Sequence, residues 1–87
     1  SVFKYFKKFL KDGGKLIALI KPQFEVGKDK IGKNGIVKEE EYRNEAIKSV
    51  IKEALECGFK IIEVIESPIT GMKGNIEYLS LFELIPY

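Results

Sequence analysis

Lys21 and Glu77 are the two residues of this sequence whose types are best suited to proton chemistry. A lysine amine can take or relay a proton from an alcohol that attacks an electrophile, and a nearby carboxylate can orient that amine. A lysine beside a carboxylate can equally be a structural ion pair, and the spacing alone favours that interpretation. We expect the two charged groups to come within contact distance above one edge of a sheet.

Lys21 follows an apolar run at residues 16–20 and is followed by Pro22. We therefore predict a strand over residues 15–21 that brings the lysine to the carboxyl edge of a sheet, where open α/β sheets place their chemistry. The apolar centre of this strand is nearly unbroken. That pattern is typical of an interior strand of a larger sheet, covered on both faces.

The segments after this strand predict a βαβ unit. An acidic cluster at residues 39–41 suits the start of a helix that runs to about Cys57, and residues 59–66 are rich in β-branched side chains, as strands are. The crossover should be right-handed, which makes the two strands parallel but not necessarily adjacent. Cys57 has no histidine nearby, so we interpret it as a packing residue rather than a nucleophile.

Glu77 lies near the start of the last predicted strand, residues 76–85. Only a turn with Gly71 and Gly74 separates it from the second strand, so these two strands should pair antiparallel. The start of the last strand then lies beside the end of the first, which brings Lys21 and Glu77 to the same edge. The predicted fold class is α/β, with a three-stranded mixed sheet, flanking helices and an antiparallel last strand.

Apolar residues at helical spacing predict an amphipathic helix over residues 2–11: Val2, Phe3, Phe6, Phe9 and Leu10. Asp12, Gly13 and Gly14 should end it, because glycine accepts the conformation of a helix C-cap. Packing of this helix against the sheet is the favoured interpretation. Its lysines leave open a role in binding membrane surfaces or RNA phosphates.

A long glycine-bearing loop is predicted at residues 22–38. Loops of this length in compact domains are usually functional or disordered. Lys28, Lys30 and Lys33 lie within it among acidic residues. Their mixed surroundings fit a solvated loop as well as they fit contacts with phosphates.

Composition limits the classes of function. The chain has 87 residues, 45% of them apolar and 32% charged, which is typical of one globular domain. With one cysteine and no histidine, it can form neither an internal disulfide nor a zinc site of its own, and we expect a reducing cytoplasm. Its apolar runs are far shorter than the roughly 20 residues of a membrane span. The net charge of +2 does not by itself identify a nucleic-acid binder.

Two spaced motifs resemble one enzyme family. They are Lys21-Pro22-Gln23-Phe24-Glu25 with Gly27, Gly32 and Gly35-Ile36-Val37 after it, and Ser67-Pro68-Ile69 followed by Gly71 and Gly74-Asn75-Ile76-Glu77-Tyr78. In type and order they resemble the carboxyl-terminal part of the TlyA or haemolysin A family of FtsJ-like ribosomal RNA methyltransferases. The resemblance covers nearly the whole chain from about Asp12 onward.

The resemblance implies a Rossmann-like methyltransferase fold whose last strand is inserted between its two neighbours. It also implies methyl transfer from S-adenosylmethionine to a ribose 2′-hydroxyl by a lysine, aspartate, lysine, glutamate set. Lys21 matches the second lysine and Glu77 the glutamate, which favours a catalytic role for the pair. The family's first lysine, its aspartate and its glycine-rich cofactor loop belong upstream. Residues 1–87 are therefore expected to form a single partial domain, the carboxyl-terminal half.

These matches define the expected partners. The expected substrate-binding residues are Lys28, Lys30, Lys33 and Asn75. The lysines would meet phosphates of ribosomal RNA, and Asn75 would help to shape the edge beside Glu77. The chain alone is expected to be inactive, without a cofactor site of its own, and to self-associate through a bare strand edge. A small stand-alone RNA-binding or interaction module is the alternative. The haemolysin name suggests membrane lysis, which the short apolar runs disfavour.

Overall fold

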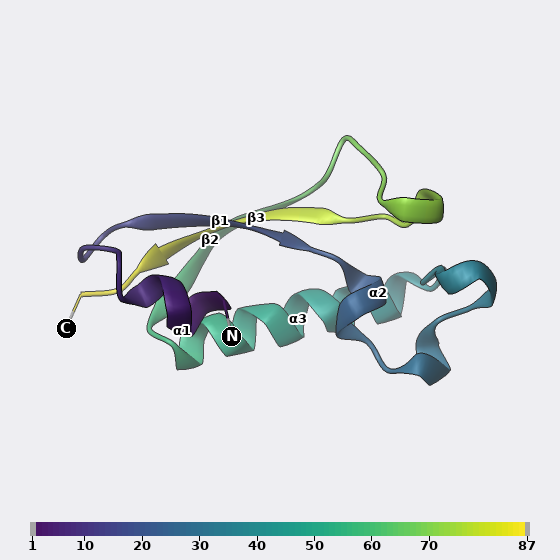
Figure 1. The fold of residues 1–87 in the computed structure, drawn as a ribbon, viewed down its shortest axis with the longest axis horizontal. Coiled ribbons are helices and arrows are strands. Elements are labelled where there is room, and N and C mark those ends of the chain that lie inside the picture. Colours follow the sequence, from purple (N-terminus) through teal and green to yellow (C-terminus); the bar gives the residue numbers. More distant parts are fainter. Residues whose placement is uncertain (1, 87) are drawn as a thin grey trace.

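In the computed structural model, which describes residues 2–86, three strands form one sheet and the helices lie on a single side of it (Figure 1). The helices are α1 (Val2–Lys7), α2 (Pro22–Glu25) and α3 (Glu40–Glu56), and the strands are β1 (Lys15–Ile20), β2 (Phe59–Glu66) and β3 (Tyr78–Leu84). Short 3-10 turns are η1 (Lys28–Lys30), η2 (Lys33–Gly35) and η3 (Met72–Gly74).

The strand order is β1-β3-β2, and β3 pairs antiparallel with both neighbours. Tyr78 at the start of β3 faces Ile20 on one side and Glu66 on the other. Because β1 and β2 are both antiparallel to β3, they run in the same direction but do not pair with each other. The α/β class, the β2–β3 hairpin and the inserted last strand are thus confirmed. The sheet of residues 2–86 is antiparallel rather than mixed, because β3 separates the two strands that run in the same direction.

Helix α3 is the principal support of the sheet. Ala46, Val50 and Ala54 recur every four residues and are buried, which makes a narrow apolar stripe along one side of the helix. Gly58, with φ of +87°, follows the helix end in the left-handed conformation that glycine adopts without steric cost. The chain then enters β2 at Phe59, as the sequence predicts.

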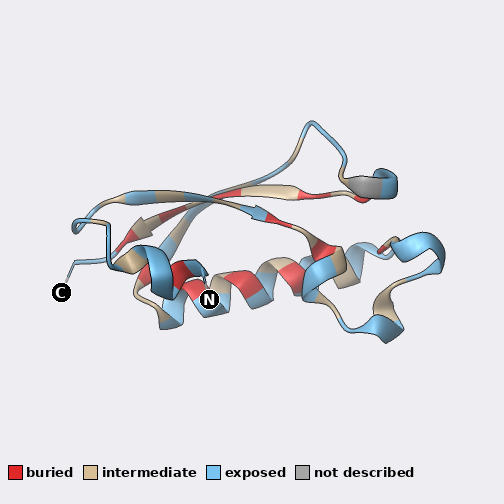
Figure 2. Ribbon diagram, in the orientation of Figure 1, coloured by how far each residue is buried: buried red, intermediate tan, exposed pale blue. Residues whose placement is uncertain are grey.

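The core lies between the helices and the sheet, where Figure 2 shows the buried residues gathered. Phe3 from α1 is 4.8 Å from Phe82 of β3 and 5.6 Å from Phe59 of β2, measured between ring centroids. Its ring meets that of Phe82 edge-on. Such offset contacts are favourable for aromatic rings, and they fix α1 to the sheet.

The opposite face of the sheet is bare of helices (Figure 1). Ile17 is 71% exposed and Leu19 is 48% exposed, so β1 is covered on one face only and lies at the edge of the sheet. The expectation of an interior strand covered on both faces is therefore not met by residues 2–86. The apolar residues of β1 on this face are not covered by any element of residues 2–86.

The first helix is shorter than predicted. It ends at Lys7 rather than near residue 11, and Phe9 is 69% exposed. The chain turns early because the Gly13 amide donates to the carbonyl of Leu84 at 2.9 Å, which pulls residues 8–14 towards the end of β3. A continued helix would carry Gly13 away from that partner.

Residues 22–38 are less open than the predicted loop, since α2, η1 and η2 lie within them. Pro22 occupies the first turn of α2, where its missing amide hydrogen costs nothing.

Across residues 2–86, no helix combines the length and the apolarity that crossing a membrane would require.

Candidate functional site

Lys21 and Glu77 flank the last pair of the β1–β3 ladder. Ile20 pairs with Tyr78, so Lys21 is the residue after the end of β1 and Glu77 the residue before the start of β3. Lys21 is the N-cap of α2 and still has extended backbone angles, φ of −112° and ψ of 97°. The structure thereby places both residues at one edge of the sheet, as the strand order predicts.

The direct contact expected between the two charged groups is not made. Glu77 is 5% exposed, and its Oε2 accepts a hydrogen bond of 2.7 Å from Nε2 of Gln23. The ammonium of Lys21 instead lies over the ring of Phe24, 5.4 Å from its centroid. Within residues 2–86, no ion pair or hydrogen bond joins Lys21 to Glu77. The amide of Gln23 takes the place expected for the lysine.

Sequence reasoning assigned no role to Gln23 or Gly71, although both belong to the motifs quoted above. Gly71 lies so close to Glu77 that an added Cβ would overlap the carboxylate. The amide of Ser67 donates to the backbone carbonyl of Glu77 at 2.8 Å. The carboxylate is therefore enclosed by α2 on one side and by the turn before β3 on the other.

Asn75 joins two loops at the same edge. It is 3% exposed; its Oδ1 accepts from the amide of Val37 at 3.0 Å and its Nδ2 donates to the carbonyl of Gly35 at 2.9 Å. Its own carbonyl accepts from the amide of Gly71 at 2.8 Å. The side chain thus shapes the edge by fixing residues 35–37 against the turn that carries Gly71.

Arg43 makes a second set of hydrogen bonds at this edge, which sequence reasoning missed. Its Nε donates to the hydroxyl of Tyr78 at 3.2 Å, and its Nη1 donates to the carbonyl of Lys38 at 2.7 Å. These contacts fix the first turns of α3 to the start of β3. A planar guanidinium with several donors suits such a junction.

The three loop lysines differ in their surroundings. Lys30 donates to both carboxylate oxygens of Glu45, at 2.7 and 3.0 Å, and this hydrogen bond raises the pKa of Lys30. It also lies over the ring of Tyr42, 5.5 Å from the centroid. Lys28 and Lys33 are exposed to solvent. Only the latter two present charges that are not engaged by a carboxylate of the described chain.

Glu25 is the exposed last residue of α2. Partial burial, and secondarily the negative charge of Glu53, raise the pKa of Glu25 above its ordinary value. The carboxyl group remains exposed enough that this effect on stability is small.

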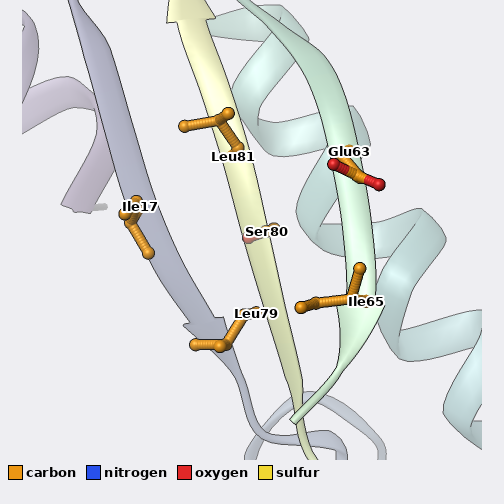
Figure 3. Close-up of a pocket in the computed structure, with 6 residues that line it drawn as sticks. All are labelled: Ile17, Glu63, Ile65, Leu79, Ser80 and Leu81. Carbon is orange, nitrogen blue, oxygen red and sulfur yellow. The ribbon is translucent and has the colours of Figure 1, made fainter.

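Figure 3 shows a groove on the helix-free face of the sheet. Its walls come from all three strands and are aliphatic apart from Ser80 and Glu63: Ile17, Glu63, Ile65, Leu79, Ser80 and Leu81. Neither Lys21 nor Glu77 contributes to it. An apolar groove with one carboxylate offers little to hold a polar, charged cofactor.

Comparison with known proteins places this geometry in a family. The family model described as FtsJ-like methyltransferase matches residues 1–84. The chain belongs to the FtsJ-like methyltransferase family. Hemolysin A of Brachyspira hyodysenteriae is 42% identical to it over 66 residues, which cover 76% of this chain and 28% of that protein. The 16S/23S rRNA (cytidine-2′-O)-methyltransferase TlyA of Mycobacterium tuberculosis (strain H37Rv) is 40% identical over 63 residues, which cover 72% of this chain and 24% of that protein.

A solved structure matches nearly the whole of this FtsJ-like chain. The "Putative hemolysin from Streptococcus thermophilus" superposes with a TM-score of 0.91 at 40% identity, and the match covers 97% of this chain and 30% of that one. This FtsJ-like chain spans about a quarter of the length of the curated relatives it matches, 28% and 24% for the two named above. The matched region is thus part of a larger protein in those relatives.

Proposed function

We propose that this chain is the carboxyl-terminal half of a methyltransferase domain that acts on the ribose 2′-hydroxyl of ribosomal RNA. Membership of the FtsJ-like family and the name of the mycobacterial relative support the reaction. The observation that carries the proposal is the register of β1 and β3, which puts Lys21 and Glu77 at adjoining positions of one edge.

The chemistry requires that a hydroxyl proton be removed while the oxygen bonds to a new carbon. The amine of Lys21 takes or relays that proton, because it lies at the rim of the sheet and can reach a substrate. The buried charge of Glu77 stabilises the amine once it is protonated. Lys28 and Lys33 contact phosphates of the RNA. Lys30 contributes less to this binding, because its charge is paired with Glu45.

S-adenosylmethionine, when bound, would supply the methyl group. The residues of this chain do not fit that cofactor: the groove of Figure 3 is aliphatic, and the lysine edge presents cations towards a cofactor that is itself positively charged at sulfur. We therefore place the cofactor site upstream. The 87-residue chain should show no binding of S-adenosylmethionine by calorimetry and no activity alone, whereas micromolar binding would refute this placement.

The test is the variant Lys21→Ala in the complete parent enzyme. Loss of a positioned general base should lower the methylation rate roughly 100- to 10,000-fold. Lys15→Ala is the matched control, because Lys15 starts the same strand at its far end and is exposed. An unchanged rate in the Lys21 variant would refute the catalytic assignment.

A stand-alone RNA-binding module is the second candidate. The exposure of Lys28 and Lys33 on one loop favours it. The 87-residue chain would then bind RNA without any upstream domain, and its affinity would fall steeply with salt. Absence of such binding would leave the methyltransferase proposal as the better account.

A further inference from the structure

Gln23 holds the buried carboxylate of this site through one end of its side-chain amide. The bond from Nε2 to Oε2 of Glu77 is 2.7 Å long. An ionised carboxylate only accepts hydrogen bonds, so the nitrogen of the amide must face it and the oxygen must face away. The orientation of the Gln23 amide is therefore set by Glu77.

The other end of the amide has no partner within residues 2–86. Oε1 of Gln23 is buried and accepts no hydrogen bond there. The great majority of buried polar atoms in proteins have a hydrogen-bond partner, and each exception calls for an explanation. An acceptor that is held in place by a carboxylate behind it is also polarised by that charge, which makes it a better acceptor for a cation.

Lys21 is a candidate donor for this oxygen. It precedes α2, two positions before Gln23, and a lysine ammonium carries three donors and no acceptor. Its present neighbour is the ring of Phe24, which is 75% exposed and holds the ammonium weakly. Rotation of a partly exposed lysine side chain is fast, so this contact does not bar another.

We propose that Gln23 is a positioning residue that links Glu77 to Lys21: Nε2 donates to Glu77, and Oε1 accepts from the ammonium of Lys21 in the working site. Glu77 thus acts on the lysine through an amide rather than by direct contact. The inference rests on the proposed function, because it assigns Gln23 a place between two residues to which that function gives roles.

The experiment is a double-mutant cycle in the complete parent enzyme, with Gln23→Met, Glu77→Gln and the combined variant. Gln23→Met keeps the length and removes both polar contacts. It should lower kcat roughly 10- to 100-fold, as expected for a lost hydrogen bond to a charged group, and leave KM for RNA nearly unchanged. The combined variant should be no slower than the slower single variant, because both act on one chain of contacts.

Two further variants make the result decisive. Glu25→Gln changes an exposed residue of the same short helix and should keep the wild-type rate. Gln23→Asn keeps the amide but is too short for both contacts, so it replaces Gln23→Met if thermal melting shows that the latter is unfolded. The inference is overturned if the folded Gln23 variant keeps kcat within about twofold, or if its effect multiplies with that of Glu77→Gln.

Lys21→Ala separates this inference from the function on which it rests. If Lys21→Ala abolishes methylation while the Gln23 variants are as fast as the wild type, the link is wrong and the proposed function stands. If Lys21→Ala is also as fast as the wild type, the proposed function fails and the link fails with it.

Discussion

Gly71 lies directly against the carboxylate of Glu77, so closely that an added Cβ would overlap Oε2. Gln23 closes the opposite side of the carboxylate with its hydrogen bond of 2.7 Å. Here glycine is required for close approach of the backbone to a charged side chain, which is one of its two ordinary uses. One buried carboxylate is thus fixed by two segments that are far apart in the sequence.

The first prediction concerns this contact. Gly71→Ala should push the Glu77 carboxylate out of its site, destabilise the chain by about 1–3 kcal/mol and slow methylation in the parent enzyme. Denaturant unfolding and single-turnover kinetics measure the two effects. Gly27→Ala is the control, because its Cβ would meet only the exposed side chain of Asp29, which can move. Wild-type values for both variants would show that the enclosure of Glu77 is unimportant.

The location of Lys21 and Glu77 at the same edge of the sheet could be predicted, because it depends on strand direction alone. A hairpin fixes β3 antiparallel to β2, and a βαβ unit fixes β2 parallel to β1, so the start of β3 lies at the same edge of the sheet as the end of β1. The two become neighbours because β3 is inserted between β1 and β2, which strand direction does not determine. The bounds of β2 could also be predicted, because Gly58 precedes and Pro68 follows a run rich in β-branched residues.

Contacts between side chains could not be predicted in this way. The sequence contains no local signal that the Glu77 carboxylate would meet Gln23 rather than Lys21, because the choice depends on how α2 turns after the strand. The early end of α1 has a similar cause. The helical periodicity continues to Leu10, but a long-range bond from Gly13 to Leu84 overrides it. The apolar run of β1 predicts burial on both faces, but residues 2–86 cover only one of them.

The second prediction separates a structural role for Asn75 from a role in substrate binding. Asn75→Ala should destabilise the chain by about 1–3 kcal/mol, because it leaves the buried amide of Val37 without an acceptor. Hydrogen exchange of the Val37 amide should accelerate in parallel. Asn44→Ala, at an exposed position on α3, is the control. Unchanged stability combined with weaker RNA binding would instead make Asn75 a substrate contact.

The third prediction concerns the loop lysines and RNA. Lys28→Ala and Lys33→Ala should each weaken RNA binding at all sequences and lower the slope of log affinity against log salt by roughly one. Lys30→Ala should have a smaller effect, because Glu45 already pairs with its charge. Lys48→Ala, on the exposed side of α3, serves as the control. Titrations at several salt concentrations measure the slopes, and equal effects for all four variants would refute a specific phosphate-binding loop.

The fourth prediction concerns self-association of the 87-residue chain. The bare face and the free edge of β1 expose aliphatic side chains beside unpaired backbone groups, a combination that favours association between copies. Light scattering should show species larger than a monomer at high concentration, and Ile17→Lys should shift them towards the monomer. Since Ile17 is 71% exposed, the substitution should leave the melting temperature nearly unchanged.

Ile69→Lys provides the matched control for this last variant. Ile69 is 77% exposed but follows β2 in the turn towards β3, outside the residues that line the groove. Its substitution adds the same charge, so it should leave association largely in place if the sheet face is responsible. A strict monomer in the wild type would refute the predicted self-association. Equal dissociation by both variants would show that net charge rather than this face governs the association.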